Sequence, residues 1–136
     1  MDPHIEGRVR NRLARARAKL ATAERLLASC DWDDAISRAY YAAYHAAQAL
    51  LLTVGLSPRT HTGTLSLFGL HFVKSGRLDA EHARALREIK EDRENGDYAE
   101  VAFFNPEEAR ARVDAARRLI DAAAGLLASD HGVRDL

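Results

Sequence analysis

The sequence predicts an all-α protein, an up-and-down bundle of four to five helices. Its 136 residues are rich in alanine, poor in β-branched residues and interrupted by only three prolines, a composition typical of helical proteins. Two segments near the two ends of the chain space their apolar residues alternately by four and three, which is the seam of a helix packed lengthwise on another. We therefore expect a single domain over residues 1–136, with its core at about 8–127.

The first expected helix covers residues 8–29. Its seam consists of Val9, Leu13, Ala16, Leu20, Ala23 and Leu27. Its outer surface is strongly basic, with Glu24 as the one acid in the span. The cations are Arg8, Arg10, Arg12, Arg15, Arg17, Lys19 and Arg25. A run of like charges is usually a solvated helix face. The alternative is a stripe that follows the phosphates of a nucleic acid.

A long central helix is expected from Asp33 to Val54, because this segment contains neither Gly nor Pro and is apolar on nearly all sides. Asp31 or Asp33 can cap its start, and Gly55 suits a left-handed end. The helix carries more apolar surface than one short chain easily covers. A homodimer that buries the remainder is the simplest outcome.

Arg38 and His45 lie on one face of this central helix. We expect both in a crowded, partly desolvated place, where an unpaired guanidinium is costly. Arg38 should therefore meet a carboxylate, a group of carbonyl oxygens or an open cleft.

Two helices are expected in the middle of the chain. A short one over residues 64–74 ends near Gly76 and has an aromatic face, formed by Leu65, Phe68 and Phe72. A longer one runs from Asp79 or Ala80 to about Asn95. It should end there, because Asn95-Gly96-Asp97 is a strong turn signal.

The last helix starts at Asn105-Pro106, where a capping residue precedes a proline at the first helical position. Its seam consists of Ala109, Val113, Ala116, Ile120, Ala123 and Leu127. The residues after Ser129 are expected to fray. The apolar stretch from Tyr98 to Phe104, which precedes this helix, is expected to pack onto the bundle.

Several classes of protein are excluded by composition and motifs. The formal charge sums to zero, so the molecule as a whole is not a polycation. The single cysteine, Cys30, leaves no internal disulfide, and the six histidines show no metal-ligand spacing. There is no glycine-rich phosphate loop, no hydrolase motif and no apolar run long enough to cross a membrane. We expect a soluble cytoplasmic protein without a cofactor or metal and without a membrane partner.

The remaining candidates for chemistry are Arg38 with His45, then Arg93, and then Asp97 with Tyr98. Arg93 should point inward, because it follows two core residues by seven and four positions. An arginine near a histidine is the minimum equipment for metal-free RNA cleavage, in which imidazole moves protons and guanidinium stabilises the phosphorane. The structural alternatives are a satisfied core histidine at 45 and a salt bridge from Arg93 to Asp97.

Three segments resemble the small stand-alone prokaryotic branch of the HEPN superfamily (higher eukaryotes and prokaryotes nucleotide-binding). They are SRAYYAAYHAAQALLLTVGLSPRTHTG at 37–63, LSLFGLHFVKSGRL at 65–78 and REIKEDRENGDY at 87–98. The resemblance covers roughly residues 8–127. It implies a helical bundle that dimerises around a shared cleft and is paired with a small nucleotidyltransferase as toxin and antitoxin. Active members are metal-independent endoribonucleases that carry an arginine, four to six residues, and then a histidine.

This chain departs from that pattern at the position that resembles the catalytic turn, which begins at Arg93. Tyr98, Ala99 and Glu100 stand where the histidine would be. The spacing of six intervening residues is met only by Arg38 and His45, in the middle of a helix.

The leading expectation is a HEPN-like dimer that binds nucleotide or RNA and pairs with a nucleotidyltransferase-type antitoxin. The expected binding residues are Arg38, Tyr41, His45, His61, Arg93, Asp97 and Tyr98. One alternative is an endoribonuclease toxin with Arg38, His45 and Arg93 as its catalytic residues. The other is a non-catalytic protein-interaction module whose interior charges only fix the packing.

Overall fold

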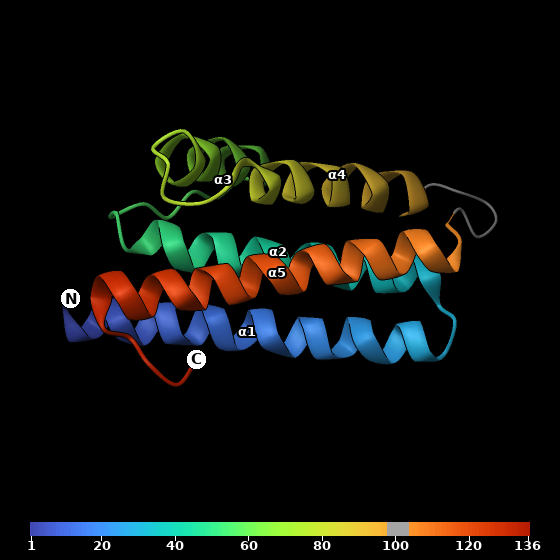
Figure 1. Ribbon diagram of the computed structural model, residues 1–136, viewed down its shortest axis with the longest axis horizontal. Helices are drawn as coiled ribbons and strands as arrows, with labels where there is room; N and C mark the ends of the chain where they lie inside the picture. The colour runs from blue at the N-terminus through green and yellow to red at the C-terminus, as the bar shows by residue number, and fades with distance from the viewer. Residues whose placement is uncertain (98–103) are drawn as a thin grey trace.

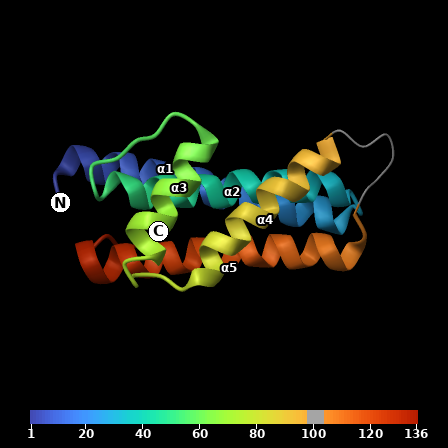
Figure 2. The ribbon, with the colours of Figure 1, turned by 90° about the horizontal axis from the view of Figure 1, so that it is seen from above.

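The computed structural model describes residues 1–97 and 104–136, and within these residues all regular secondary structure is helical. Three long helices lie side by side, and a second layer made of shorter helices covers one side of them (Figures 1 and 2). The long helices are α1 (Pro3–Ala28), α2 (Trp32–Leu52) and α5 (Pro106–His131); the second layer is α3 (His61–Phe68), the π-helical segment η1 (Gly69–Val73) and α4 (Ala80–Asp97). The prediction of an all-α bundle is confirmed.

Helix α2 is the centre of this bundle, as its sequence predicts. Tyr40 and Leu51 on α2 have no exposed surface, and the alanines between them are buried, so α1, α4 and α5 approach its backbone closely. The chain therefore covers the apolar surface of α2 by itself, and the reason given for a homodimer does not hold. The homodimer remains a prediction from the family resemblance. Val54, which the sequence places on the apolar side, is 37% exposed just beyond the helix.

The start of α2 is held differently from the prediction. The side chain of Asp31, at the N-cap position, makes no capping hydrogen bond. The carboxylate of Asp33 instead accepts a hydrogen bond of 3.1 Å from the backbone N–H of Phe104, which lies just before α5. The end of α2 agrees with the prediction, because Gly55 is left-handed at φ +78°. Between α1 and α2, the exposed Cys30 is also left-handed, at φ +63°.

The predicted turn at Asn95-Gly96-Asp97 is wrong, because α4 continues through these residues to Asp97. Gly96 serves close packing instead. A Cβ atom at this position would lie 3.2 Å from the ring of Phe104 and 3.7 Å from Cγ of Asp33. Glycine is thus needed where α4 passes the start of α2. Of the apolar stretch predicted to pack down, Tyr98 to Phe103 lie outside the described residues, and Phe104 is buried.

The single helix predicted at 64–74 starts earlier and changes its winding. The Thr60 side chain accepts a hydrogen bond of 2.9 Å from the N–H of Gly63, so α3 begins at His61. From Gly69 the chain follows a π-helical turn, in which the Lys74 N–H donates to the Gly69 carbonyl at 2.8 Å. Phe68 and Phe72 are fully buried, as predicted.

The two ends of the chain are more ordered than the sequence predicts. Helix α1 begins at Pro3, where Asp2 caps the N–H of His4, rather than at residue 8. The expected fraying after Ser129 is wrong. Helix α5 ends at a left-handed Gly132, Val133 is completely buried, and the tail returns toward α1 (Figure 1).

Candidate functional site

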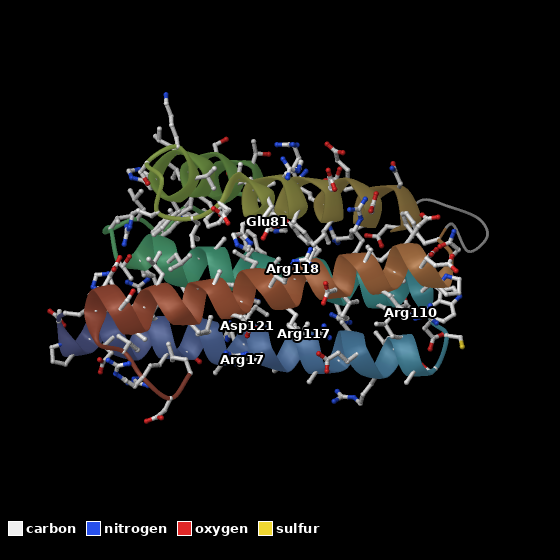
Figure 3. All side chains as sticks on the ribbon, viewed as in Figure 1. Arg17, Glu81, Arg110, Arg117, Arg118 and Asp121 are labelled. Atoms are coloured by element: carbon white, nitrogen blue, oxygen red, sulfur yellow. The ribbon has the colours of Figure 1, made fainter. Side chains whose placement is uncertain are left out.

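The cations of α1 fall into two sets. On one side Arg10 lies 3.7 Å from Glu6, and Arg17 lies 3.6 Å from Asp121 of α5 (Figure 3). The other set lies toward α2 and forms no ion pair within the described part of the chain. Together with two α2 side chains it makes what we call the cationic face, which consists of Arg12, Arg15, Lys19, Arg38 and His45.

His45 shows how positive this face is. The ring is half-buried, and Nη1 of Arg12 lies 3.3 Å from its Nδ1. Burial, followed by the charges of Arg12, Arg15 and Lys19, lowers the pKa of His45 to about 4. A guanidinium can only donate, so Nδ1 is the acceptor and the proton of the neutral ring is on Nε2. At neutral pH His45 is therefore an uncharged hydrogen-bond donor beside three cations.

Arg38 is exposed rather than crowded, which corrects the expectation for this residue. Of the three surroundings anticipated, the structure shows an open groove at the α1–α2 junction. The groove is lined by Thr22, Leu26, Asp34, Ser37 and Arg38. Arg38 and His45 are seven residues apart on α2, which is about 10 Å along the helix axis. The two side chains therefore share a face but do not meet at one reacting atom.

A second group of side chains gathers where α2, α3 and α4 meet. We call it the tyrosine–arginine cluster; it consists of Tyr40, Tyr41, Tyr44, His61 and Arg93. Arg93 reaches into it from α4, and the predicted inward direction of this side chain is confirmed, since its exposure is only 22%.

Arg93 is held mainly by aromatic groups. Its Nη2 donates a 2.9 Å hydrogen bond to the hydroxyl of Tyr41, and its guanidinium lies 5.0 Å from the ring centre of Tyr41 and 5.4 Å from that of Tyr40. The salt bridge to Asp97 is present, at 3.5 Å from Nε, but it lacks hydrogen-bond geometry. The buried Nε of Arg93 has no hydrogen-bond acceptor among residues 1–97 and 104–136.

His61 brings an imidazole into this cluster from the first residue of α3. Its Nδ1 lies 2.6 Å from the hydroxyl of Tyr40, and its ring stacks on Tyr44 at 4.5 Å between centres. Burial, then the charges of Arg93 and Lys90, hold the pKa of His61 below its usual value of 6.5. Burial also raises the pKa of Tyr40, so its hydroxyl keeps its proton. A tyrosine hydroxyl both donates and accepts hydrogen bonds, so this contact is compatible with either tautomer of His61.

The two groups open on the same side of α2. Arg38, Tyr41 and His45 are spaced by three and four residues, so they form one row along the helix. Arg12 of α1 reaches His45 at one edge of this row, and Arg93 of α4 reaches Tyr41 at the other. The surface between α1 and α4 thus combines two imidazoles, a tyrosine and cations that form no ion pair within the described ranges.

Several of the predicted site residues are brought together, and two supporting residues were missed. Tyr41, His61, Arg93 and Asp97 meet in or beside the tyrosine–arginine cluster, and Arg38 and His45 belong to the cationic face. Tyr98 lies outside the described residues. Tyr40 and Tyr44 were not among the predicted site residues. The sequence did contain an indication of them, because these two tyrosines lie one turn apart on a helix and a histidine follows in the next loop.

Metal and membrane roles find no basis in the described parts of the chain. No three His, Cys, Asp or Glu side chains among residues 1–97 and 104–136 are grouped so that they could hold a metal ion. None of the helices in these ranges has the length and apolar character that a membrane span requires.

The fold and the site define a small all-helical domain with a cationic, aromatic surface beside its central helix. The HEPN domain model matches residues 9–126, and the chain belongs to the HEPN domain family. The resemblance seen in the central, aromatic and Arg93 segments is thereby confirmed.

Relatives occur in both archaea and bacteria. A UPF0332 protein of Thermotoga maritima is 36% identical over 108 residues, covering 79% of this chain and 82% of that protein. A UPF0332 protein of Pyrococcus horikoshii is 46% identical over 74 residues, covering 54% of this chain and 52% of that protein. This alignment thus spans about half the length of the Pyrococcus protein. A Methanocaldococcus jannaschii protein named as a candidate toxin is 39% identical, covering 61% of this chain and 62% of that protein.

Proposed function

We propose that this chain is a toxin-class HEPN protein that binds RNA across the surface between α1 and α4. The observation that carries the proposal is the group of cations on this surface that the fold does not neutralise. Arg12, Arg15, Lys19 and Arg38 form no ion pair in the described part of the chain, and Arg93 stands at the other edge of the same row. Such a surface matches phosphate oxygens, which only accept hydrogen bonds.

The geometry suits a strand better than a single phosphate. From Arg12 to Lys19 the axis of α1 advances about 10 Å, a length that covers more than one backbone phosphate of a single strand. Tyr41, between the cationic face and Arg93, offers an aromatic surface on which a base can stack. A free nucleotide would contact only Arg93, Tyr41 and His61, and the cations of α1 would then bind nothing.

The test compares Arg93→Ala with the wild type in binding a fluorescent single-stranded RNA at fixed salt. Arg110→Ala is the control, because Arg110 is exposed on α5 and forms no ion pair among the described residues (Figure 3). We expect about tenfold weaker binding for Arg93→Ala and an unchanged affinity for Arg110→Ala. Equal affinity of all three proteins, or no binding by any, contradicts the proposal. Competition by a mononucleotide separates nucleotide binding from RNA binding.

Metal-independent RNA cleavage is the second candidate function. It is favoured by His61, whose imidazole lies near Arg93, whereas the sequence after Arg93 has no histidine at the expected spacing. In this reaction the 2′-oxygen attacks the adjacent phosphorus as it loses its proton. The 5′-oxygen leaves with a proton, and the products are a 2′,3′-cyclic phosphate and a 5′-hydroxyl end. Arg93 would stabilise the charge on the phosphorane.

An RNA incubation experiment separates binding from cleavage. The contact from Arg12 to Nδ1 places the proton of the His45 ring on Nε2. The Tyr40 hydroxyl both donates and accepts, so Nδ1 of His61 can be protonated or basic, and His61 is the imidazole to test in cleavage. Incubation of RNA with the protein in the presence of a chelator tests cleavage. If cleavage disappears in His61→Ala, His61 is a catalytic residue. If cleavage is lost in His45→Ala instead, the catalytic histidine is His45, as the alternative with Arg38 and His45 predicts.

We also propose that the chain forms a homodimer and binds an antitoxin. This part of the proposal is supported by the toxin name of the Methanocaldococcus relative and by the resemblance to family members that pair with a nucleotidyltransferase. We expect a homodimer in which the α1–α4 surfaces of two copies share a cleft, with a nucleotidyltransferase-type antitoxin as partner. Mass measurement by light scattering tests the dimer. Co-purification of such a partner without nucleic acid, from a protein that fails to bind RNA, would favour the interaction module instead.

A further inference from the structure

A groove lies in the second layer of the bundle, away from the surface proposed for RNA. It runs between α3–η1 and α4 and has a volume of about 440 Å³. Its lining residues are Leu65, Ser66, Gly69, Leu70, Lys74, Ala83 and Arg87. Leu70 is 51% exposed, more than any other large hydrophobic side chain in the described residues.

The groove is produced by the backbone rather than by a gap in the core. The π-helical turn begins at Gly69, and a Cβ atom at Gly69 would meet no atom within 4 Å, so the missing side chain leaves the hollow open. On the opposite side of the same segment Phe68 and Phe72 are fully buried and stack at 5.9 Å. Leu70 is thus turned outward while its neighbours complete the core.

Two cations stand at the edges of this apolar groove. Lys74 follows η1 and Arg87 lies on α4, both are exposed, and neither forms an ion pair within the described ranges. A two-fold contact of the groove with the same groove of a second copy would bring these cations together, which disfavours self-association here. The groove also lacks the converging polar groups that fix a small molecule.

We propose that this groove binds an acidic amphipathic helix of a partner protein. Apolar side chains on one face of that helix would contact Leu65, Leu70 and Ala83. Asp or Glu residues beside them would pair with Lys74 and Arg87. This is the helix-in-groove mode of recognition, in which the apolar face supplies affinity and the flanking charges set orientation. The proposal does not depend on RNA binding.

The probe is a labelled helical peptide of about four turns, with leucines on one face and glutamates beside them. Its binding to the full chain is measured by fluorescence anisotropy. Gly69→Trp fills the hollow, and Gly69→Ala is its control, because the backbone at Gly69 is right-handed helical and an added methyl group meets nothing. We expect about tenfold weaker binding for Gly69→Trp and little change for Gly69→Ala.

A second pair of variants keeps the test valid if Gly69→Trp folds poorly. Leu70→Ala should weaken binding severalfold, whereas Val54→Ala, at another exposed apolar residue that lies outside the groove, should not. Lys74→Glu with Arg87→Glu should reverse the preference from the glutamate peptide to its lysine counterpart. Equal binding of the two peptides by the wild type, or full affinity in Leu70→Ala, overturns the proposal. A wild-type dimer that Leu70→Ala converts to a monomer overturns it in favour of a second copy.

Discussion

The two sides of α1 differ in how their cations are used. Toward α5, Arg17 pairs with Asp121, and Arg117 of α5 forms an ion pair of 2.9 Å with Glu24 of α1 (Figure 3). Toward α2, Arg12, Arg15 and Lys19 form no ion pair with a carboxylate of residues 1–97 or 104–136. After burial, their charges are the next causes of the lowered pKa of His45. One basic helix thus has a side whose charges are compensated by the fold and a side whose charges are not. Uncompensated charge beside a packed interface is costly unless a ligand supplies the counter-charge, so this difference supports the proposal that RNA binds on the α2 side.

The largest effect we expect is a loss of RNA affinity when the cations on the α2 side of α1 are removed. Replacing Arg12, Arg15 and Lys19 together by glutamine should weaken single-stranded RNA binding about a hundredfold at 0.1 M salt. The slope of log affinity against log salt should fall by about two, because about 0.7 is lost for each phosphate contact. Titrations at several salt concentrations measure both quantities.

The matched control changes the same charge on the compensated side. Arg10, Arg17 and Arg117, each of which forms an ion pair, are replaced by glutamine, and the affinity and the salt slope should stay close to those of the wild type. Equal losses in the two triple variants would show that only the net charge of the molecule matters, and the comparison between the two sides would then fail.

The next effect concerns the pH dependence of stability. Because the pKa of His45 is lowered to about 4 from 6.5, the unfolded chain binds the proton first. Stability from the neutral ring is present above pH 6.5 and is lost as the pH falls toward 4. After allowance for the partial exposure of the ring, we expect a loss of about 1–2 kcal/mol in the free energy of unfolding. Denaturant titrations at pH 7 and pH 4.5 measure it.

The His45→Gln variant isolates this contribution, since carboxylates also titrate over the same range. Its loss of stability on acidification should be smaller than that of the wild type. Bound RNA should reduce the difference, because phosphate beside His45 raises the pKa of the ring. An identical pH dependence in the two proteins would exclude His45 from the cationic face.

The smallest effect we expect is on the free energy of unfolding when the ion pairs between α1 and α5 are removed. Removing the partly exposed ion pairs by Arg17→Gln and Arg117→Gln should cost at most about 1 kcal/mol each. The Arg12→Gln and Arg15→Gln changes should cost less, or even stabilise, because they relieve repulsion around His45. Thermal unfolding of the four single variants ranks their losses of stability. Larger losses for Arg12→Gln and Arg15→Gln than for the other two variants would mean that Arg12 and Arg15 stabilise the fold.

Much of this arrangement follows from the sequence. The seams of α1 and α5 were predicted residue by residue, because the spacing of apolar residues reports directly which face is buried; only Leu27 is less buried than expected. The inward direction of Arg93 follows from the same periodicity. The compensated side of α1 could not be assigned, since Asp121 lies far away in the sequence and its position depends on how α5 packs.

The failures share a cause, which is that local signals were overruled by tertiary contacts. Asn95-Gly96-Asp97 has the composition of a turn, but Gly96 is required by the approach of Phe104 and Asp33. Val133 follows a glycine in a polar tail and nevertheless packs into the core. His61 reaches Tyr40 through a loop whose path no periodic pattern describes, so the cluster around Arg93 could not be assembled from spacing alone.

The exposed Cys30 in the turn between α1 and α2 gives the molecule a single chemical handle. A maleimide dye attached there would label each chain once, near the end of the α1–α2 junction that carries the groove beside Arg38. Quenching of the dye would then test the proposed RNA binding at the cationic face, and energy transfer between two labelled chains would test the proposed dimer. No residue would need to be introduced for either measurement.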